Sequence, residues 1–180
     1  MILLHGMNPA TPAFDQSYFR SALSRFPTGV TVVVAQAADG SPIGMTISSF
    51  SSLSLEPPLV LWTLKLESAS IAHMRQAEGY VIHVLSAAQQ DLAYRFAKGS
   101  QQERFEGIPL KRSRSGLWML DMPDCSAWFE CRNHHQHDAG DHAIFIGAVH
   151  ACAWTNAQPL IHHSRRFHHS PPVAEIIVER

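Results

Sequence analysis

A continuous β-branched run followed by a tight-turn signal constrains the fold of this chain more than any other feature. The segment GVTVVVAQ, residues 29–36, predicts a buried strand because its apolar residues are nearly uninterrupted and rich in valine. The sequence ADGSP follows, and its Asp39–Gly40 pair is typical of a β-hairpin turn. The return strand is expected over IGMTISSF, residues 43–50. We therefore predict that the first two strands pair antiparallel.

Strands predominate along the rest of the chain. Further strands are predicted at 57–65, 80–86, 126–135 and 141–154. The last two are joined through QHDAG as one long antiparallel pair. Many strands, few helices and hairpin connections favour an antiparallel barrel with peripheral helices. The alternative is a doubly wound parallel sheet, which needs a regular alternation of strands and helices that the second half lacks.

The helices are expected to be short. They are predicted at 15–26, 68–79 and 87–99. Asp15 is the expected N-cap of the first, Ser68 caps the second, and Gly79 ends it. Residues 99–117 are expected to form a long polar loop. We expect one domain over 14–170, a flexible leader at 1–13 and a C-terminal tail at 171–180.

Composition limits the kinds of partner and the cellular compartment that we expect for this chain. Only 16% of residues are charged and 46% are hydrophobic, which favours a large buried subunit interface and hence a homodimer. A net charge of −1 gives no electrostatic footprint for nucleic acid. No apolar run reaches the roughly 18 residues that a membrane span needs. The first residues lack the basic region of a signal peptide, so we expect a cytoplasmic protein.

Cysteines and histidines are the first candidates for chemistry. Cys125, Cys131 and Cys152 are odd in number and lack CxxC spacing, so we expect reduced, buried thiols. Histidines crowd HHQHDAGDH, residues 134–142, and HHSRRFHH, residues 162–169. Imidazole suits zinc or iron, but the spacing matches neither a zinc finger nor HExxH. We expect no metal site, and a histidine-based metalloprotein remains an alternative.

The segment GMTISSFSSLSLEPPLV, residues 44–60, combines many small hydroxyls with few charges. Hydroxyls and backbone N–H groups at a sheet edge suit a polar, planar ligand. Ser68 and Ser70 open the next predicted helix, where N–H groups favour a phosphate, and Lys65 adds a positive charge. Together these residues could hold a phosphorylated ring cofactor. The alternative is that the serines only form turns and caps. The chain carries no GxGxxG, P-loop or GxSxG motif.

Four segments in the right order resemble the flavin reductase family, the reductase partners of two-component flavin monooxygenases. They are FRSALSRFPTGVTVVVA, GMTISSFSSLSLEPPLV, YVIHVLSAAQQDLAYRFA and GDHAIFIGAV. The resemblance covers residues 19–167. It implies a mainly β, antiparallel Greek-key split barrel that binds FMN or FAD, with the flavin near the interface of a homodimer.

The resemblance also assigns site residues by position. It places Thr46, Ile47, Ser48, Ser49 and Phe50 at the isoalloxazine edge, Lys65, Ser68 and Ser70 by the ribityl phosphate, Phe105 near the flavin, and His142 and Phe167 at the nicotinamide. Two departures stand out. Ile47 and Ser48 replace an Ala-Asn pair that is frequent in the family, and Glu67 would oppose a phosphate if it points inward.

The activity that the resemblance implies is hydride transfer from NADH or NADPH to N5 of FMN or FAD. The reduced flavin then passes transiently to a partner monooxygenase. The flavin carries the redox chemistry, so no side chain needs to act as nucleophile or base. His142 would orient the nicotinamide. The alternative from another class is a flavin-binding sensor or storage protein without turnover. The sequence leaves FMN against FAD, and NADH against NADPH, open.

Overall fold

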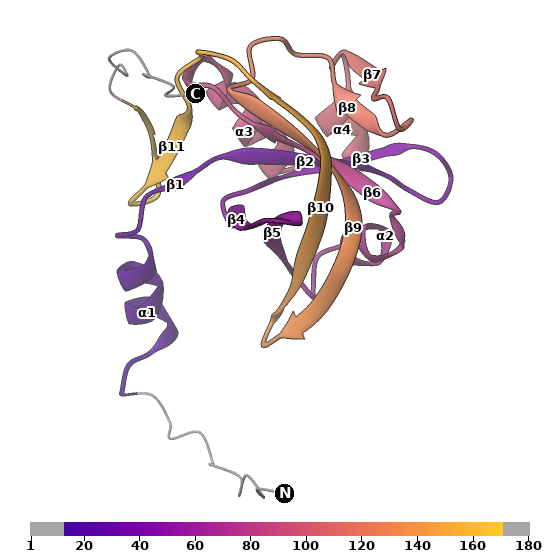
Figure 1. Cartoon of the computed structure of the whole chain (residues 1–180). Helices are drawn as coiled ribbons and strands as arrows, with labels where there is room; N and C mark the ends of the chain where they lie inside the picture. The colour runs from indigo at the N-terminus through magenta and orange to yellow at the C-terminus, as the bar shows by residue number, and fades with distance from the viewer. Residues whose placement is uncertain (1–12, 171–180) are drawn as a thin grey trace, which may run out of the picture.

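The computed structural model describes residues 13–170, in which a seven-stranded sheet curls around an apolar interior (Figure 1). In spatial order its strands are β3 (Pro42–Ile47), β2 (Thr31–Gln36), β6 (Gly79–Val84), β9 (Ala127–Ala139), β10 (His142–Trp154), β5 (Pro58–Lys65) and β4 (Ser51–Leu55). Every strand pair in this part of the chain is antiparallel. The predicted mainly β, antiparallel fold is confirmed, and the parallel alternative is excluded.

Smaller elements surround this sheet. A three-stranded sheet contains β1 (Thr28–Gly29), β11 (Leu160–His163) and β12 (Arg166–His169), and a hairpin contains β7 (Leu110–Arg112) and β8 (Trp118–Leu120). The helices are α1 (Gln16–Leu23), α2 (Ile71–Gln76), α3 (Gln90–Ala97) and α4 (Gln101–Phe105), with a 3-10 turn η1 (Ala87–Gln89). Within residues 13–170, none of these helices has both the length and the apolar character that crossing a bilayer requires.

Apolar side chains pack on both faces of β2. One cluster fills the inside of the curled sheet, where Trp62 stacks on Phe145 with ring centroids 4.5 Å apart. The other lies on the opposite face of β2 and includes Val32, Phe96 and Leu120. Burial on both faces explains why the sequence of this strand is continuously apolar rather than alternating.

Both predicted hairpins are present, with altered ends. The β2–β3 turn contains Asp39 and Gly40, and Gly40 has the positive φ of +86° that this turn requires. The long hairpin of β9 and β10 turns at Gly140 and Asp141, so β9 continues to Ala139, beyond its predicted end at residue 135, while β10 closely matches its prediction. The strand predicted to reach residue 50 ends at Ile47, and β4, which was not predicted, follows it.

The helix predictions were right in place and partly wrong in detail. Asp15 caps α1 by accepting a hydrogen bond of 2.7 Å from the Tyr18 N–H. The prediction of Ser68 as N-cap of α2 was wrong, because Ser70 holds that position, and Gly79 begins β6 instead of ending the helix. The predicted loop at 99–117 was also wrong, because it contains α4 and β7.

The predicted chain ends cannot be compared with the structure. The tail at 171–180 and all of the leader at 1–13 except its last residue lie outside the described residues. The first described helix, α1, projects away from the main sheet (Figure 1) and has no buried residue. It is tied to the rest by the β1–β11 pair and by a hydrogen bond from Ser164 N–H to the Ser24 carbonyl.

Candidate functional site

A cavity of about 570 Å³ opens beside strand β3. Its walls come from the β2–β3 turn, from β3, from α2 and the loop before it, and from the segment that joins α3 to α4. The volume lies in the range of small-molecule and cofactor sites, about 300–1,000 Å³. Three of the predicted ligands, Thr46, Ser68 and Ser70, line it.

Gln101 links the walls of this cavity. Its Oε1 accepts a hydrogen bond of 2.9 Å from the Gly44 N–H in β3, and its Nε2 donates to Ser70 Oγ at 3.2 Å. Ser70 is 8% exposed, and its N–H donates in turn to Ser68 Oγ at 3.3 Å. The two serine hydroxyls thereby accept within the protein and keep their protons available for a ligand.

Arg104 brings a positive charge to the same cavity. Its Nη1 donates to the Gly44 carbonyl at 2.7 Å, and its Nε donates to the Lys98 carbonyl at 3.0 Å. Burial lowers the pKa of the guanidinium, but an arginine stays charged in a protein. Two main-chain anchors fix the group, which leaves its other N–H donors for an anion.

Gly44 allows the rings of Phe96 and Phe105 to pack closely against β3. A Cβ atom at this position would lie 2.8 Å from Phe105 Cζ and 2.8 Å from Phe96 Cε1. The ring of Phe105 packs edge-on against Phe96, with centroids 5.0 Å apart. Phe105, predicted to lie near the flavin, therefore supports the floor of the cavity and is absent from its lining.

The segment predicted to hold the ring edge follows directly after β3. Ile47 is buried, Ser48 is exposed, and Phe50 is half-buried. The Ser49 hydroxyl is already used by β5, because it donates to the Thr63 carbonyl at 3.1 Å and accepts from the Thr63 N–H at 2.9 Å. The Thr46 hydroxyl donates to the Ala93 carbonyl at 2.8 Å.

The main-chain N–H groups of residues 48–50, unlike the Thr46 and Ser49 hydroxyls, are not used by hydrogen bonds within the described part of the chain. The hydrogen bonds found within residues 13–170 include none donated by the N–H groups of Ser48, Ser49 or Phe50. Adjacent unpaired N–H groups at the end of a strand are available to a ligand that presents acceptors.

Lys65 and His142 face each other across β5 and β10, away from the cavity lining. His142 Nδ1 lies 2.7 Å from Asp141 Oδ1, and this hydrogen bond holds the pKa of the exposed Asp141 carboxyl below its usual range. Phe167 on β12 packs against Tyr94, with ring centroids 4.9 Å apart. Of the predicted phosphate ligands, the two serines thus lie together and Lys65 does not join them.

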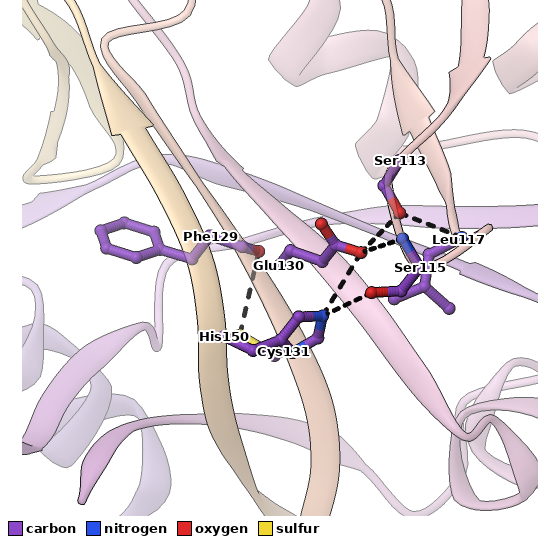
Figure 2. A network of polar contacts seen from close by, with 7 residues as sticks. All are labelled: Ser113, Ser115, Leu117, Phe129, Glu130, Cys131 and His150. Carbon is purple, nitrogen blue, oxygen red and sulfur yellow. Dashed lines mark hydrogen bonds and ion pairs between the residues drawn. The ribbon is translucent and has the colours of Figure 1, made fainter.

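A second polar cluster lies between the β7–β8 hairpin and the long strands (Figure 2). Glu130 Oε1 accepts hydrogen bonds of 2.5 Å from Ser113 Oγ and 3.2 Å from the Ser115 N–H. The Nε2 atom of His150 lies 2.9 Å from Ser115 Oγ and 3.3 Å from Glu130 Oε1, so both groups meet the same ring nitrogen. A catalytic triad needs the acid on the opposite ring nitrogen, so this cluster does not activate the serine.

The structure shows where possible metal ligands and the three cysteines lie within residues 13–170. No group of three or more His, Cys, Asp or Glu side chains in this part of the chain could hold a metal ion. All three cysteines are free thiols. Cys125 and Cys131 are buried as expected, but Cys152 is exposed, and its predicted burial was wrong because it lies near the end of β10.

Sequence reasoning missed Gln101 and Arg104. Both lie on α4, in the region expected to be a loop. A usable signal was present: Ser100 and Glu103 form a capping box, with Ser100 Oγ accepting from the Glu103 N–H at 3.3 Å. The spacing Ser-x-x-Glu marks a helix start.

Residues 23–171 match the Flavin reductase like domain, so the chain belongs to this family, as the four segments indicated. The chain is 43% identical over 142 residues to the FMN reductase (NADH) SmoA of Agrobacterium fabrum, covering 79% of each chain. Two further relatives are longer, and the chain spans 43% and 58% of their length.

Solved structures are similar over most of the chain. One is the NADH:FAD oxidoreductase SgcE6 of Streptomyces globisporus C-1027 in complex with NAD and FAD fragments, with 30% identity, a TM-score of 0.81 and coverage of 89% of this chain and 96% of that one. Another is the styrene monooxygenase flavin reductase of Pseudomonas putida S12, with 31% identity, a TM-score of 0.76 and coverage of 85% and 97%.

Proposed function

We propose that this chain is an NAD(P)H:flavin oxidoreductase that reduces FMN or FAD and supplies the reduced flavin to a partner monooxygenase. The observation that carries the proposal is the open cavity beside β3, where Ser68, Ser70 and Arg104 keep hydrogen-bond donors free. Membership of the flavin reductase family and the names of the relatives support the same activity.

The residues present fit a flavin nucleotide. The cavity places an arginine and two serine hydroxyls where an anion can bind, and Gly44 leaves room for the Phe96 and Phe105 rings that support the cavity floor. We assign Ser68, Ser70 and Arg104 to the phosphate, because charge-assisted hydrogen bonds from arginine suit phosphate oxygens. Arg104 takes the role that the sequence alone had given to Lys65.

The N–H groups of residues 48–50 are assigned to the acceptor edge of the flavin ring. Ser49 clamps this segment to β5 through Thr63, which holds the N–H groups in place. Thr46 and Ile47 orient the end of β3 through Ala93 and through burial in the core. When bound, the flavin supplies the ring that accepts hydride, and the protein contributes position and hydrogen bonds.

His142 is assigned to the nicotinamide side. Its Nδ1 is held by Asp141, which leaves Nε2 free to meet the carboxamide or a phosphate of the hydride donor. Lys65, directly across the β5–β10 pair, adds a positive charge for the same anionic substrate. Phe167 is retained as a stacking partner, although it lies on β12 against Tyr94.

The proposal includes a homodimer in the cytoplasm. Apolar side chains stand exposed on and just after α1, with Tyr18 70%, Leu23 57% and Phe26 74% exposed, and on β4 Leu55 is 94% exposed. A second copy of the chain would cover such surfaces. Light scattering after gel filtration measures the mass, and a monomer at micromolar concentration would contradict the proposed homodimer.

The three free thiols support the cytoplasmic part of the proposal, because the cytoplasm is a reducing compartment.

Turnover distinguishes this function from a flavin-binding sensor. Purified protein is mixed with NADH or NADPH and then with FMN or FAD, and nicotinamide oxidation is recorded. We expect oxidation that requires both protein and flavin. A protein that binds flavin but leaves the nicotinamide unchanged would be a sensor or storage protein instead.

A further inference from the structure

Resting on the proposed function, we infer that the outer end of the cavity binds the adenosine half of FAD. This end is lined by Asp39, Ser41, His73 and Ala97. FAD is then the preferred flavin, and FMN fills only the inner part of the site.

The first argument is the reach of the cavity along β3. The ring is assigned to residues 48–50, just beyond the end of β3, and the nearest residue of this strand end that lines the cavity is Thr46. From there the cavity follows the strand past Gly44 to Ser41, about 17 Å at the usual rise per strand residue. Two of the groups assigned to the phosphate lie midway: Arg104, which donates to the Gly44 carbonyl, and Ser70, which Gln101 links to the Gly44 N–H. A mononucleotide that ends at its phosphate leaves the part near Ser41 unfilled.

The second argument is the change of charge along the cavity. The middle carries Arg104 and serine hydroxyls, which suit a pyrophosphate. The outer end carries Asp39, whose Oδ1 accepts hydrogen bonds from Ser41 Oγ at 2.6 Å and from the Ser41 N–H at 3.0 Å. These bonds hold the pKa of the Asp39 carboxyl below its usual range, so it is ionised at neutral pH.

An ionised carboxylate repels a phosphate and accepts hydrogen bonds from hydroxyls or amines. The ribose hydroxyls and the exocyclic amine of adenine are such donors, and they follow the pyrophosphate in FAD. Ala37 and Ala97 give the outer end small apolar walls, and the imidazole of His73 lines it as well. The order of groups along the cavity therefore matches the order of groups along FAD.

Calorimetric titration without nicotinamide tests the inference, because it measures binding rather than turnover. The key variant is Ala97→Trp, which fills the outer end from an exposed position. Gln102→Trp is the matched control, since Gln102 is exposed on α4 and does not line the cavity. Asp39→Asn removes the charge and keeps the size of the side chain.

We expect the unmodified protein to bind FAD more tightly than FMN. Ala97→Trp should weaken FAD binding at least tenfold and change FMN binding less than threefold. Asp39→Asn should weaken FAD binding about tenfold, as befits a lost hydrogen bond to a charged group. Gln102→Trp should leave both affinities unchanged.

FMN binding as tight as FAD, or equal losses for both flavins in Ala97→Trp, would overturn the inference and leave the proposed function intact. A raised KM for NADH in Ala97→Trp with FMN as acceptor would also overturn it, because the outer end would then hold the hydride donor. Binding of neither flavin by the unmodified protein would remove the proposed function together with the inference.

Discussion

The cavity beside β3 and the Glu130 cluster both hold charged side chains between a strand and a short connecting segment, but they use their hydrogen bonds differently. Glu130 is 1% exposed, and its Oε1 is met by Ser113, Ser115 and His150 (Figure 2). Arg104 is anchored only to carbonyls and faces open volume. A buried charge met by its own protein stabilises the fold, whereas a charge with spare donors is available to a ligand.

We expect the largest effect from Glu130→Ala, which should change stability but not flavin binding and so distinguish the two regions. Without the carboxylate, the Ser113 hydroxyl and the Ser115 N–H lose their acceptor, and we expect the free energy of unfolding to fall by about 3 kcal/mol. Flavin affinity should stay unchanged. Chemical denaturation and flavin titration of the same preparation measure both quantities. A loss of flavin binding in folded protein would show that the cluster belongs to the site.

Acidification should remove the contribution that the Glu130 cluster makes to stability. Burial raises the pKa of Glu130, and the hydrogen bonds from Ser113 and Ser115 lower it. The lowering outweighs the effect of burial, so the pKa lies below the ordinary value of 4.5. A lowered folded pKa stabilises the protein above the unfolded pKa, and this contribution is lost as the pH falls through the folded value. Glu130→Gln should therefore lose less stability than the unmodified protein on acidification below 4.5. Equal acid sensitivity would contradict the assignment.

We expect the next largest effect from Gly44→Ala, which should lower both stability and flavin affinity. The new methyl group would meet Phe96 and Phe105 at 2.8 Å, and overpacking of this kind costs about 1–3 kcal/mol. Displacement of the Phe105 ring should also disturb α4, and with it Gln101 and Arg104. We expect a lower melting temperature together with weaker flavin binding. Unchanged flavin affinity would mean that the floor of the cavity does not position its walls.

A smaller effect, confined to binding, is expected for Arg104→Met, which keeps the apolar stem and removes the charge. FMN affinity should fall about tenfold, which is about 1.4 kcal/mol. Riboflavin has no phosphate and serves as the control ligand, so its affinity should not change. A parallel loss for riboflavin and FMN would place Arg104 at the ring instead of the phosphate.

The smallest effect is expected for His142→Ala. The KM for NADH should rise several-fold while flavin affinity stays nearly unchanged, because His142 lies at the start of β10 opposite Lys65 and does not line the cavity. Steady-state kinetics with saturating flavin measure the KM. An unaltered KM would remove His142 from the nicotinamide site.

Local signals in the sequence predicted six of the seven strands of the main sheet, but not the short strands of the two smaller sheets. The valine run of β2, the Asp39–Gly40 turn and the long hairpin depend on near neighbours in the chain, and they were found. Strand β4 was missed because SSLSL carries serines that are as typical of turns as of a half-exposed strand. Helix α4 was missed although its capping box was legible.

The site was less accessible from sequence, because its key contacts join distant residues. Gln101 contacts Gly44 and Ser70, and Arg104 contacts Gly44, which lies 60 positions earlier. No local pattern announces such a contact. Conversely, the serine-rich segment suggested hydroxyl ligands, but the Ser49 hydroxyl is consumed by Thr63, and the available groups there are main-chain N–H.

Anaerobic mixing of the protein with NADH and an oxidised flavin tests the central claim most directly. If the cavity and the adjoining 48–50 segment hold a flavin for hydride transfer, the visible absorbance of FMN or FAD should bleach only when the protein is present. Arg104→Met should slow the bleaching of FMN at limiting flavin and leave that of riboflavin unchanged. Flavin that keeps its absorbance with NADH and with NADPH would contradict the account.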